Sequence, residues 1–224
     1  MAYNMKDQLA VGKLGEQVAI DYVKKSCKLG RLSFESYEDV RSIKTYQEQD
    51  IDFLIHRKDG RTVTLDAKTD TYTTGNIFLE QAVDSYLFDE NGNVINCNPV
   101  TNESTLHHSD GWLYKNANCI FYYFSSTQML YVFHRVNAAL YATELLDAGY
   151  KLKQEKRPFP RAAEIHEKGR PLTKYYGIGL LLPAEQTLYS ERMQGHMWKW
   201  RVEQDKTGHF RFIPVKTRKF VKNL

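Results

Sequence analysis

Cysteine is scarce in this sequence, and long apolar runs are missing. Its 224 residues include three cysteines, Cys27, Cys97 and Cys119, which lie far apart and form no C-x₂-C pair. This spacing excludes a disulfide framework and a zinc site of the C-x₂-C kind, so we expect reduced thiols. No run of about 18 apolar residues occurs, and the first residues lack the pattern of a signal peptide. We therefore expect a cytoplasmic protein with no membrane contact.

The composition is that of a folded protein, with the positive charge gathered at one end. Apolar residues make up 42% and charged residues 26% of the chain, which argues against intrinsic disorder. The net charge of +4 hides an asymmetry, because residues 192–224 hold nine Lys or Arg and two acidic residues. Such a segment favours polyanions, with an ordinary solvated surface as the alternative. The basic residues that we expect to contact nucleic acid are Lys199, Arg201, Arg211, Lys216, Arg218 and Lys219.

Residues 5–25 have the periodicity of a helix with a broad apolar arc, formed by Ala10, Val11, Leu14, Val18 and Tyr22. Glu16 projects between Ile20 and Val23, so its carboxylate should point toward protein. Burying an unpaired charge costs several kcal/mol, and a cation should therefore meet Glu16. That cation is either a Lys or Arg at the edge of the core, or a metal ion or catalytic lysine.

A β-hairpin is predicted from two short apolar runs, residues 50–56 and 61–68, with a glycine-containing turn between them. Because side chains alternate along a strand, Asp66 and Lys68 share one face of the second strand. Taken alone, this pair is explained by a solvated face with an ion pair. The position of Asp52 on the first strand decides whether this pair belongs to a larger cluster of charged side chains.

The turn allows two registers for this hairpin. A two-residue turn would place Asp52 opposite Ala67, on the wrong face from Asp66. A three-residue loop, Lys58–Gly60, with the glycine in the left-handed region, would place Asp52 opposite Asp66. We expect the second register. Two like charges about 5 Å apart would then destabilise the sheet unless a cation lay between them.

The rest of the chain is predicted to be mainly β-structure with one further long helix. The expected elements are a strand at 75–85, a polar loop at 89–110, a short helical piece at 111–117, an apolar hairpin at 118–135, a helix at 136–149, an irregular segment at 153–171, a strand at 175–183 and a hairpin at 197–215 with its turn near Gly208. The helix at 136–149 should end at Gly149. In the last hairpin, aromatic side chains alternate with basic ones, which suits either base stacking or a half-buried ribbon.

The order of a helix with an inward Glu, a strand with Asp and a strand with Asp-x-Lys resembles the PD-(D/E)XK nuclease superfamily over residues 9–145. The residues that match its motif are Glu16 in "GKLGEQVA", Asp52 in "DIDFLI", and Asp66 and Lys68 in "DAK". Two features depart from this motif. Asp50 stands where Pro or Gly is frequent, and the triplet begins with Asp, which is rarer at this position than Glu. Asp50 shares a strand face with Asp52 and is the alternative ligand.

The resemblance implies an α/β (α+β) fold with a restriction-endonuclease-like core, in which a mixed β-sheet is flanked by helices. This core would span residues 1–149. Residues 150–224 would form a β-rich basic extension. Relatives of this kind often dimerise, so a homodimer is among the expectations.

The resemblance also implies a chemistry. Mg²⁺ or Mn²⁺ would be held by Asp52, Asp66, Glu16 and the backbone carbonyl of Ala67, since hard divalent ions take oxygen ligands. Lys68 would orient or deprotonate a water molecule and stabilise negative charge. The expected activity is endonucleolytic or resolvase-like hydrolysis of DNA, with RNA as a further candidate. The alternative is a nuclease-fold module that binds nucleic acid or protein without cutting.

Two further sets of residues are weaker candidates. Glu80 and Gln81, on the strand after the Asp-x-Lys triplet, would be secondary site residues or satisfied polar groups at a sheet edge. His107 and His108 are adjacent in a loop without partner cysteines, so we expect an ordinary surface there and no zinc site.

Overall fold

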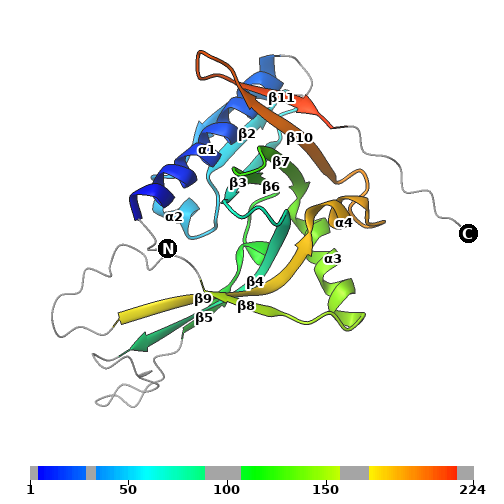
Figure 1. The fold of residues 1–224 in the computed structure, drawn as a ribbon. Coiled ribbons are helices and arrows are strands. Elements are labelled where there is room, and N and C mark those ends of the chain that lie inside the picture. Colours follow the sequence, from blue (N-terminus) through cyan, green and yellow to red (C-terminus); the bar gives the residue numbers. More distant parts are fainter. Residues whose placement is uncertain (1–4, 29–33, 89–106, 157–171, 216–224) are drawn as a thin grey trace, which may run out of the picture.

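The computed structural model describes residues 5–28, 34–88, 107–156 and 172–215, and these form a mixed α/β structure with two sheets (Figure 1). The helices are α1 (Met5–Lys28), α2 (Lys44–Gln47), the 3₁₀ turn η1 (Trp112–Tyr114), α3 (Arg135–Asp147) and α4 (Ala184–Tyr189). The strands are β1 (Phe34–Asp39), β2 (Phe53–Arg57), β3 (Thr62–Asp70), β4 (Asn76–Phe88), β5 (His107–Asp110), β6 (Cys119–Phe124), β7 (Met129–His134), β8 (Lys153–Lys156), β9 (Leu172–Pro183), β10 (Met197–Gln204) and β11 (Phe210–Pro214).

The larger sheet has seven strands in the order β1-β2-β3-β6-β7-β10-β11. Only the central β3–β6 pair is parallel, and every other neighbouring pair is antiparallel. The second sheet, β5-β4-β9-β8, is antiparallel throughout. The predicted mixed sheet with flanking helices is therefore present, although much of the layer on one side of it is a second sheet.

The β2–β3 hairpin has the predicted three-residue loop. Gly60 has φ +80°, in the left-handed region, and its N–H donates to the Arg57 carbonyl at 2.9 Å. Phe53 pairs with Leu65 and Ile55 with Val63. This register, continued one residue past the start of β2, brings Asp52 opposite Asp66, so the expected register is confirmed.

The helix α1 covers one face of the seven-stranded sheet. Val18, Tyr22 and Val23 are buried in a core with Phe53 and Leu65. The predicted apolar arc is therefore confirmed from Leu14 onward, but Ala10 is exposed because the contact with the sheet begins about one turn later.

A second core fills the space between the other face of the seven-stranded sheet, the second sheet and helices α3 and α4. Its members include Ile120, Tyr122 and Phe124 from β6 and Leu79 from β4. Since Asp66 pairs with Ile120 and Lys68 with Tyr122, both charged residues belong to this second face. The two faces of β3 are thus buried under different layers.

Most of the predicted secondary structure is present. The apolar hairpin is β6–β7, the next helix ends before Gly149 (φ +91°), and Gly208 lies in the last turn with φ +84°. Two expectations are wrong in part. Within the expected loop at 89–110, residues 107–110 form β5, and within the expected irregular segment, Lys153–Lys156 form β8, because β4 and β9 offer free sheet edges there. Residues 89–106 and 157–171 lie outside the described part.

The predicted boundary near residue 149 lies between α3 and β8. Strands on either side of it hydrogen-bond to one another, since β9 pairs with β4 and β10 with β7. No helix in the described ranges is long and apolar enough to cross a membrane. Cys119 is a free thiol, as expected, whereas the side chains of Cys27 and Cys97 fall outside the described set.

Candidate active site

The predicted Asp66–Lys68 pair forms on β3. The Asp66 residue is 2% exposed, and Lys68 Nζ lies 3.0 Å from Asp66 Oδ2. No hydrogen bond of regular geometry reaches this Oδ2 within the described structure. Asp50 Oδ1 approaches the same ammonium at 3.9 Å. A buried carboxylate is thus held mainly by charge.

Asp52 joins this pair through the edge of the hairpin. Its backbone N–H donates to the Leu65 carbonyl at 2.9 Å, and its Oδ2 accepts a hydrogen bond of 2.8 Å from the Ala67 N–H. The strand β2 begins only at Phe53, so at Asp52 a side-chain oxygen takes the place of a backbone acceptor. This contact fixes the Asp52 carboxylate beside the Asp66–Lys68 pair.

The electrostatics of the cluster follow from its burial. Burial raises the pKa of Asp66 to about 7, the charges of Asp52 and Asp50 add to the rise, and Lys68 opposes it. Burial also raises the pKa of Asp52. For Lys68, burial lowers the pKa, but the neighbouring carboxylates of Asp66 and Asp50 outweigh it and the net shift is upward. Three acidic groups therefore share one ammonium.

Glu16 has the cationic partner that its position predicted, and that partner is an arginine. Arg41 makes an ion pair with Glu16, holds Asp39 at 2.7 Å, and lies 5.2 Å from the centre of the Phe53 ring. Glu16 comes from α1, on the face of the sheet opposite to Asp66. It is near enough to Asp52 that the charge of Asp52 contributes to its raised pKa, although burial is the main cause.

The described residues contain no group of three or more His, Cys, Asp or Glu side chains placed to hold a metal ion together. The donor set that does fit a hard divalent ion is the Asp52–Asp66 pair, because carboxylate oxygens are the ligands that such ions take. Asp66 Oδ2 is buried and has no regular hydrogen bond in the described structure. Glu16 does not join the pair. The Ala67 N–H is used by Asp52, and its carbonyl as a ligand stays a prediction.

The secondary candidates lie in different surroundings. The prediction that Asp50 shares a strand face with Asp52 is wrong, because β2 begins at Phe53 and Asp50 lies in the preceding turn with φ +51°. Its Oδ1 lies 3.9 Å from Lys68 Nζ, which keeps it as the alternative ligand. Glu80 is 3% exposed on β4, where a bulge separates it from Ala82, and its charge contributes to the raised pKa of Tyr122. Gln81 lies at that bulge, with a buried Nε2 that has no hydrogen-bond partner in the described structure.

Sequence reasoning missed two groups around the cluster. Asp70 continues the charged face of β3 two residues beyond Lys68, and accepts a hydrogen bond of 3.3 Å from the Tyr122 hydroxyl. The strand alternation would have found Asp70. Arg41 carries no local signal, because its partner Glu16 is 25 residues earlier in the chain.

Three of the residues predicted to contact nucleic acid lie on the β10–β11 hairpin. On β10, Lys199 forms an ion pair with Glu185, and Arg201 lies 3.0 Å from Glu203. Arg211 is exposed on β11. Lys216, Arg218 and Lys219 lie outside the described residues. Of the adjacent histidines, His108 binds Asp84, with Nδ1 2.6 Å from Oδ1, while the side chain of His107 is not described.

No protein-family model matches this chain, and neither a curated protein sequence nor a solved structure is significantly similar to it.

Proposed function

We propose that this chain is a metal-dependent phosphodiesterase that cuts DNA, with an active site at Asp52, Asp66 and Lys68. The observation that carries the proposal is the hairpin register, which brings two carboxylates from neighbouring strands together beside one lysine. Burial raises the pKa of both carboxylates more than the nearby cations lower it, so their ionised forms are disfavoured. A bound cation would supply compensating positive charge.

The roles of the side chains follow from their charges. Asp52 and Asp66 would hold Mg²⁺ or Mn²⁺, and the ion would supply a water of lowered pKa and neutralise charge on the phosphate. Lys68 stays protonated at neutral pH, since its pKa is raised by the adjacent carboxylates, and it can donate to a phosphate oxygen or orient a water molecule. Glu16 would act indirectly, by orienting Arg41 close to Asp52.

The test is cleavage of supercoiled, linear and branched DNA by the purified full chain with Mg²⁺, Mn²⁺ or EDTA. Asp66→Asn and Lys68→Met should each lower the cleavage rate on the order of 10²–10³-fold, because the first removes a metal ligand and the second removes the ammonium that stabilises charge on the phosphate. Glu16→Gln should lower it on the order of 10-fold, as expected for an outer group that orients the site.

The matched control is Asp147→Asn, which removes one exposed carboxylate at the end of α3 and should leave the rate unchanged. Thermal unfolding of every variant separates loss of folding from loss of activity. Equal cleavage by the wild type and Asp66→Asn would contradict the proposal.

A second candidate is a nuclease-fold module that binds nucleic acid without cutting it. The ion pair of Glu16 with Arg41 favours this reading, because it occupies the third acidic group of the motif. This candidate predicts salt-dependent DNA binding that persists in EDTA and in Asp66→Asn, with no cleavage under either metal.

A further inference from the structure

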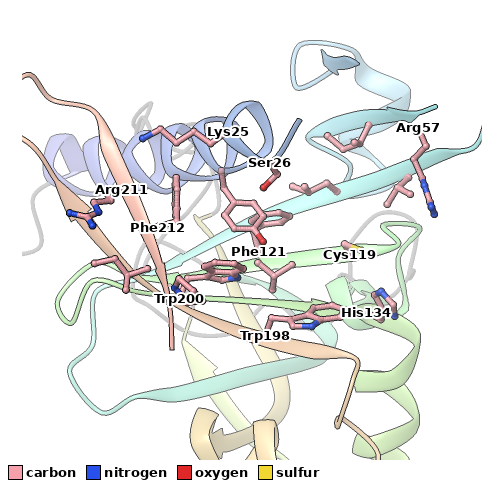
Figure 2. Close-up of a pocket in the computed structure, with 17 residues that line it drawn as sticks. Lys25, Ser26, Arg57, Cys119, Phe121, His134, Trp198, Trp200, Arg211 and Phe212 are labelled. Carbon is pink, nitrogen blue, oxygen red and sulfur yellow. The ribbon is translucent and has the colours of Figure 1, made fainter. Parts of the chain in front are cut away.

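A large pocket lies on the face of the seven-stranded sheet that α1 covers. It has a volume of about 870 Å³ and lies between the last turns of α1 and the β10–β11 hairpin, over strands β2, β3, β6 and β7 (Figure 2). This volume is in the range of small-molecule and cofactor sites.

The pocket is separate from the candidate active site. Val63 and Leu65 of β3 line it, whereas Asp66 and Lys68 alternate with them and belong to the opposite face of the sheet. Its ligand therefore need not be cleaved by the Asp52–Asp66 pair, and binding in the pocket does not depend on the proposed activity.

Aromatic rings form much of the pocket wall. Tyr22 makes edge contacts with Trp200 at 5.3 Å and with Phe212 at 5.2 Å between ring centroids, which fixes these rings. Trp198 is 41% exposed, an unusual exposure for so large an apolar ring. The Nε1 of Trp200 is buried and has no hydrogen-bond partner in the described structure. The wall thus offers an open ring face at Trp198, whereas the buried Nε1 of Trp200 is out of reach of a ligand.

The charged residues around these rings are all positive. Lys25, Arg57 and Arg211 line the pocket, and no Asp or Glu in the described part of the chain does. Arg57 is partly neutralised by Asp59 at 3.1 Å, and Lys25 donates to the Phe210 carbonyl while lying over the Phe212 ring. Arg211 has no ion-pair partner among the described residues. Figure 2 shows Lys25 and Arg211 near one end of the pocket, with Trp200 and then Trp198 following toward His134.

We propose that this pocket binds a nucleotide. The base would stack on Trp198, and the phosphate would contact Arg211 and Lys25. Base stacking on aromatic side chains together with a nearby cation is the chemistry by which proteins hold single nucleotides without sequence preference. The ligand is either a free mononucleotide or one nucleotide of a single strand.

Titration of the full chain in EDTA tests this. AMP and dTMP serve as free nucleotides, and their binding is measured by quenching of tryptophan fluorescence. Fluorescein-labelled dT₁₂ serves as the single strand, and its binding is measured by fluorescence anisotropy. Trp198→Ala and Arg211→Gln should each weaken binding about tenfold, while Trp198→Phe retains most of the affinity because it keeps a ring.

Arg201→Gln is the matched control. It removes the same charge from the same hairpin, but Arg201 is not among the residues that line the pocket. Binding of AMP or dTMP that is lost in Arg211→Gln and kept in Arg201→Gln supports a free nucleotide, and the same pattern for dT₁₂ alone supports a strand. Equal weakening by both Arg variants, or no binding of any probe, overturns the proposal. Asp66→Asn should bind normally whether or not the protein cuts DNA.

Discussion

The side chains of the candidate site together carry more negative than positive charge. Asp52 is held by one backbone N–H, Asp66 by the ammonium of Lys68, and both carboxylates have raised pKa values because burial disfavours their ionised forms. In the absence of a divalent ion, protonation is the remaining way to relieve this repulsion. The site should therefore couple proton binding to stability.

We expect the metal-free protein to lose stability as the pH rises toward neutrality. The folded pKa of Asp66, about 7, lies above the ordinary value of 3.8, so the folded state keeps a proton that the unfolded chain has released. The stability from this proton is fully present below about pH 4 and is lost as the pH rises through about 7, by up to about 1.4 kcal/mol per pH unit.

Urea unfolding in EDTA at about pH 5.5, 6.5 and 7.5 measures the effect. Asp66→Asn cannot ionise at this position, so the free energy of unfolding of the variant should rise relative to that of the wild type with each increase in pH. Groups outside this cluster titrate equally in both proteins and cancel in the difference. A difference that does not change with pH would show that Asp66 titrates normally.

Among the secondary-structure elements, α1 and β3 depend on a close approach at one glycine. A Cβ on Gly15 would lie 2.9 Å from the Cβ of Thr69, closer than real side chains come. The same helix contains Gly12, where an added Cβ would meet no atom of another element within 4 Å. One helix therefore contains a glycine that is required and one that is not.

We expect Gly15→Ala to destabilise the protein by about 1–3 kcal/mol, because α1 or Thr69 must shift away. Gly12→Ala should be neutral or stabilise it by up to about 1 kcal/mol, since alanine loses less conformational entropy in a helix. Chemical denaturation of the two variants checks this, with Gly12→Ala as the internal control. Equal effects would mean that the contact of α1 with Thr69 does not limit packing.

The molecule as a whole is built from strands that are distant in the chain. The strand β4 pairs with β9, and β7 pairs with β10, so residues after 149 complete both sheets. They also contribute to both cores, through Leu180, Leu182, Met193, Met197, Val202 and Phe210. A chain cut at residue 149 would expose two sheet edges and much apolar surface.

We therefore expect a fragment of residues 1–149 to show no cooperative unfolding transition. It should bind a hydrophobic dye such as ANS strongly, unlike the full chain measured in parallel. Thermal and urea unfolding followed by circular dichroism provide the measurement. A sharp transition in the fragment would instead indicate that the region before residue 149 folds independently.

Local sequence patterns predicted much of the fold and the centre of the candidate site. Of the two registers that the turn allowed, the expected one, with a three-residue loop at Lys58–Gly60, is present and brings Asp52 opposite Asp66, and strand alternation placed Lys68 on the same face as Asp66. These predictions succeeded because turn geometry and side-chain alternation depend on neighbouring residues. The second sheet was not predicted, since β4 and β9 lie nearly 100 residues apart in sequence and neither strand indicates its partner.

The sequence by itself determined that Glu16 points toward protein and needs a cation, that Asp66 and Lys68 share one face of a strand, and that aromatic and basic residues alternate near the C-terminal end. Only the tertiary structure decided that the cation is Arg41, that Glu16 and Asp66 lie on opposite faces of the sheet, and that Trp198 and Arg211 border a pocket. The physical reason is that helix-on-sheet packing joins side chains with no fixed spacing in the chain.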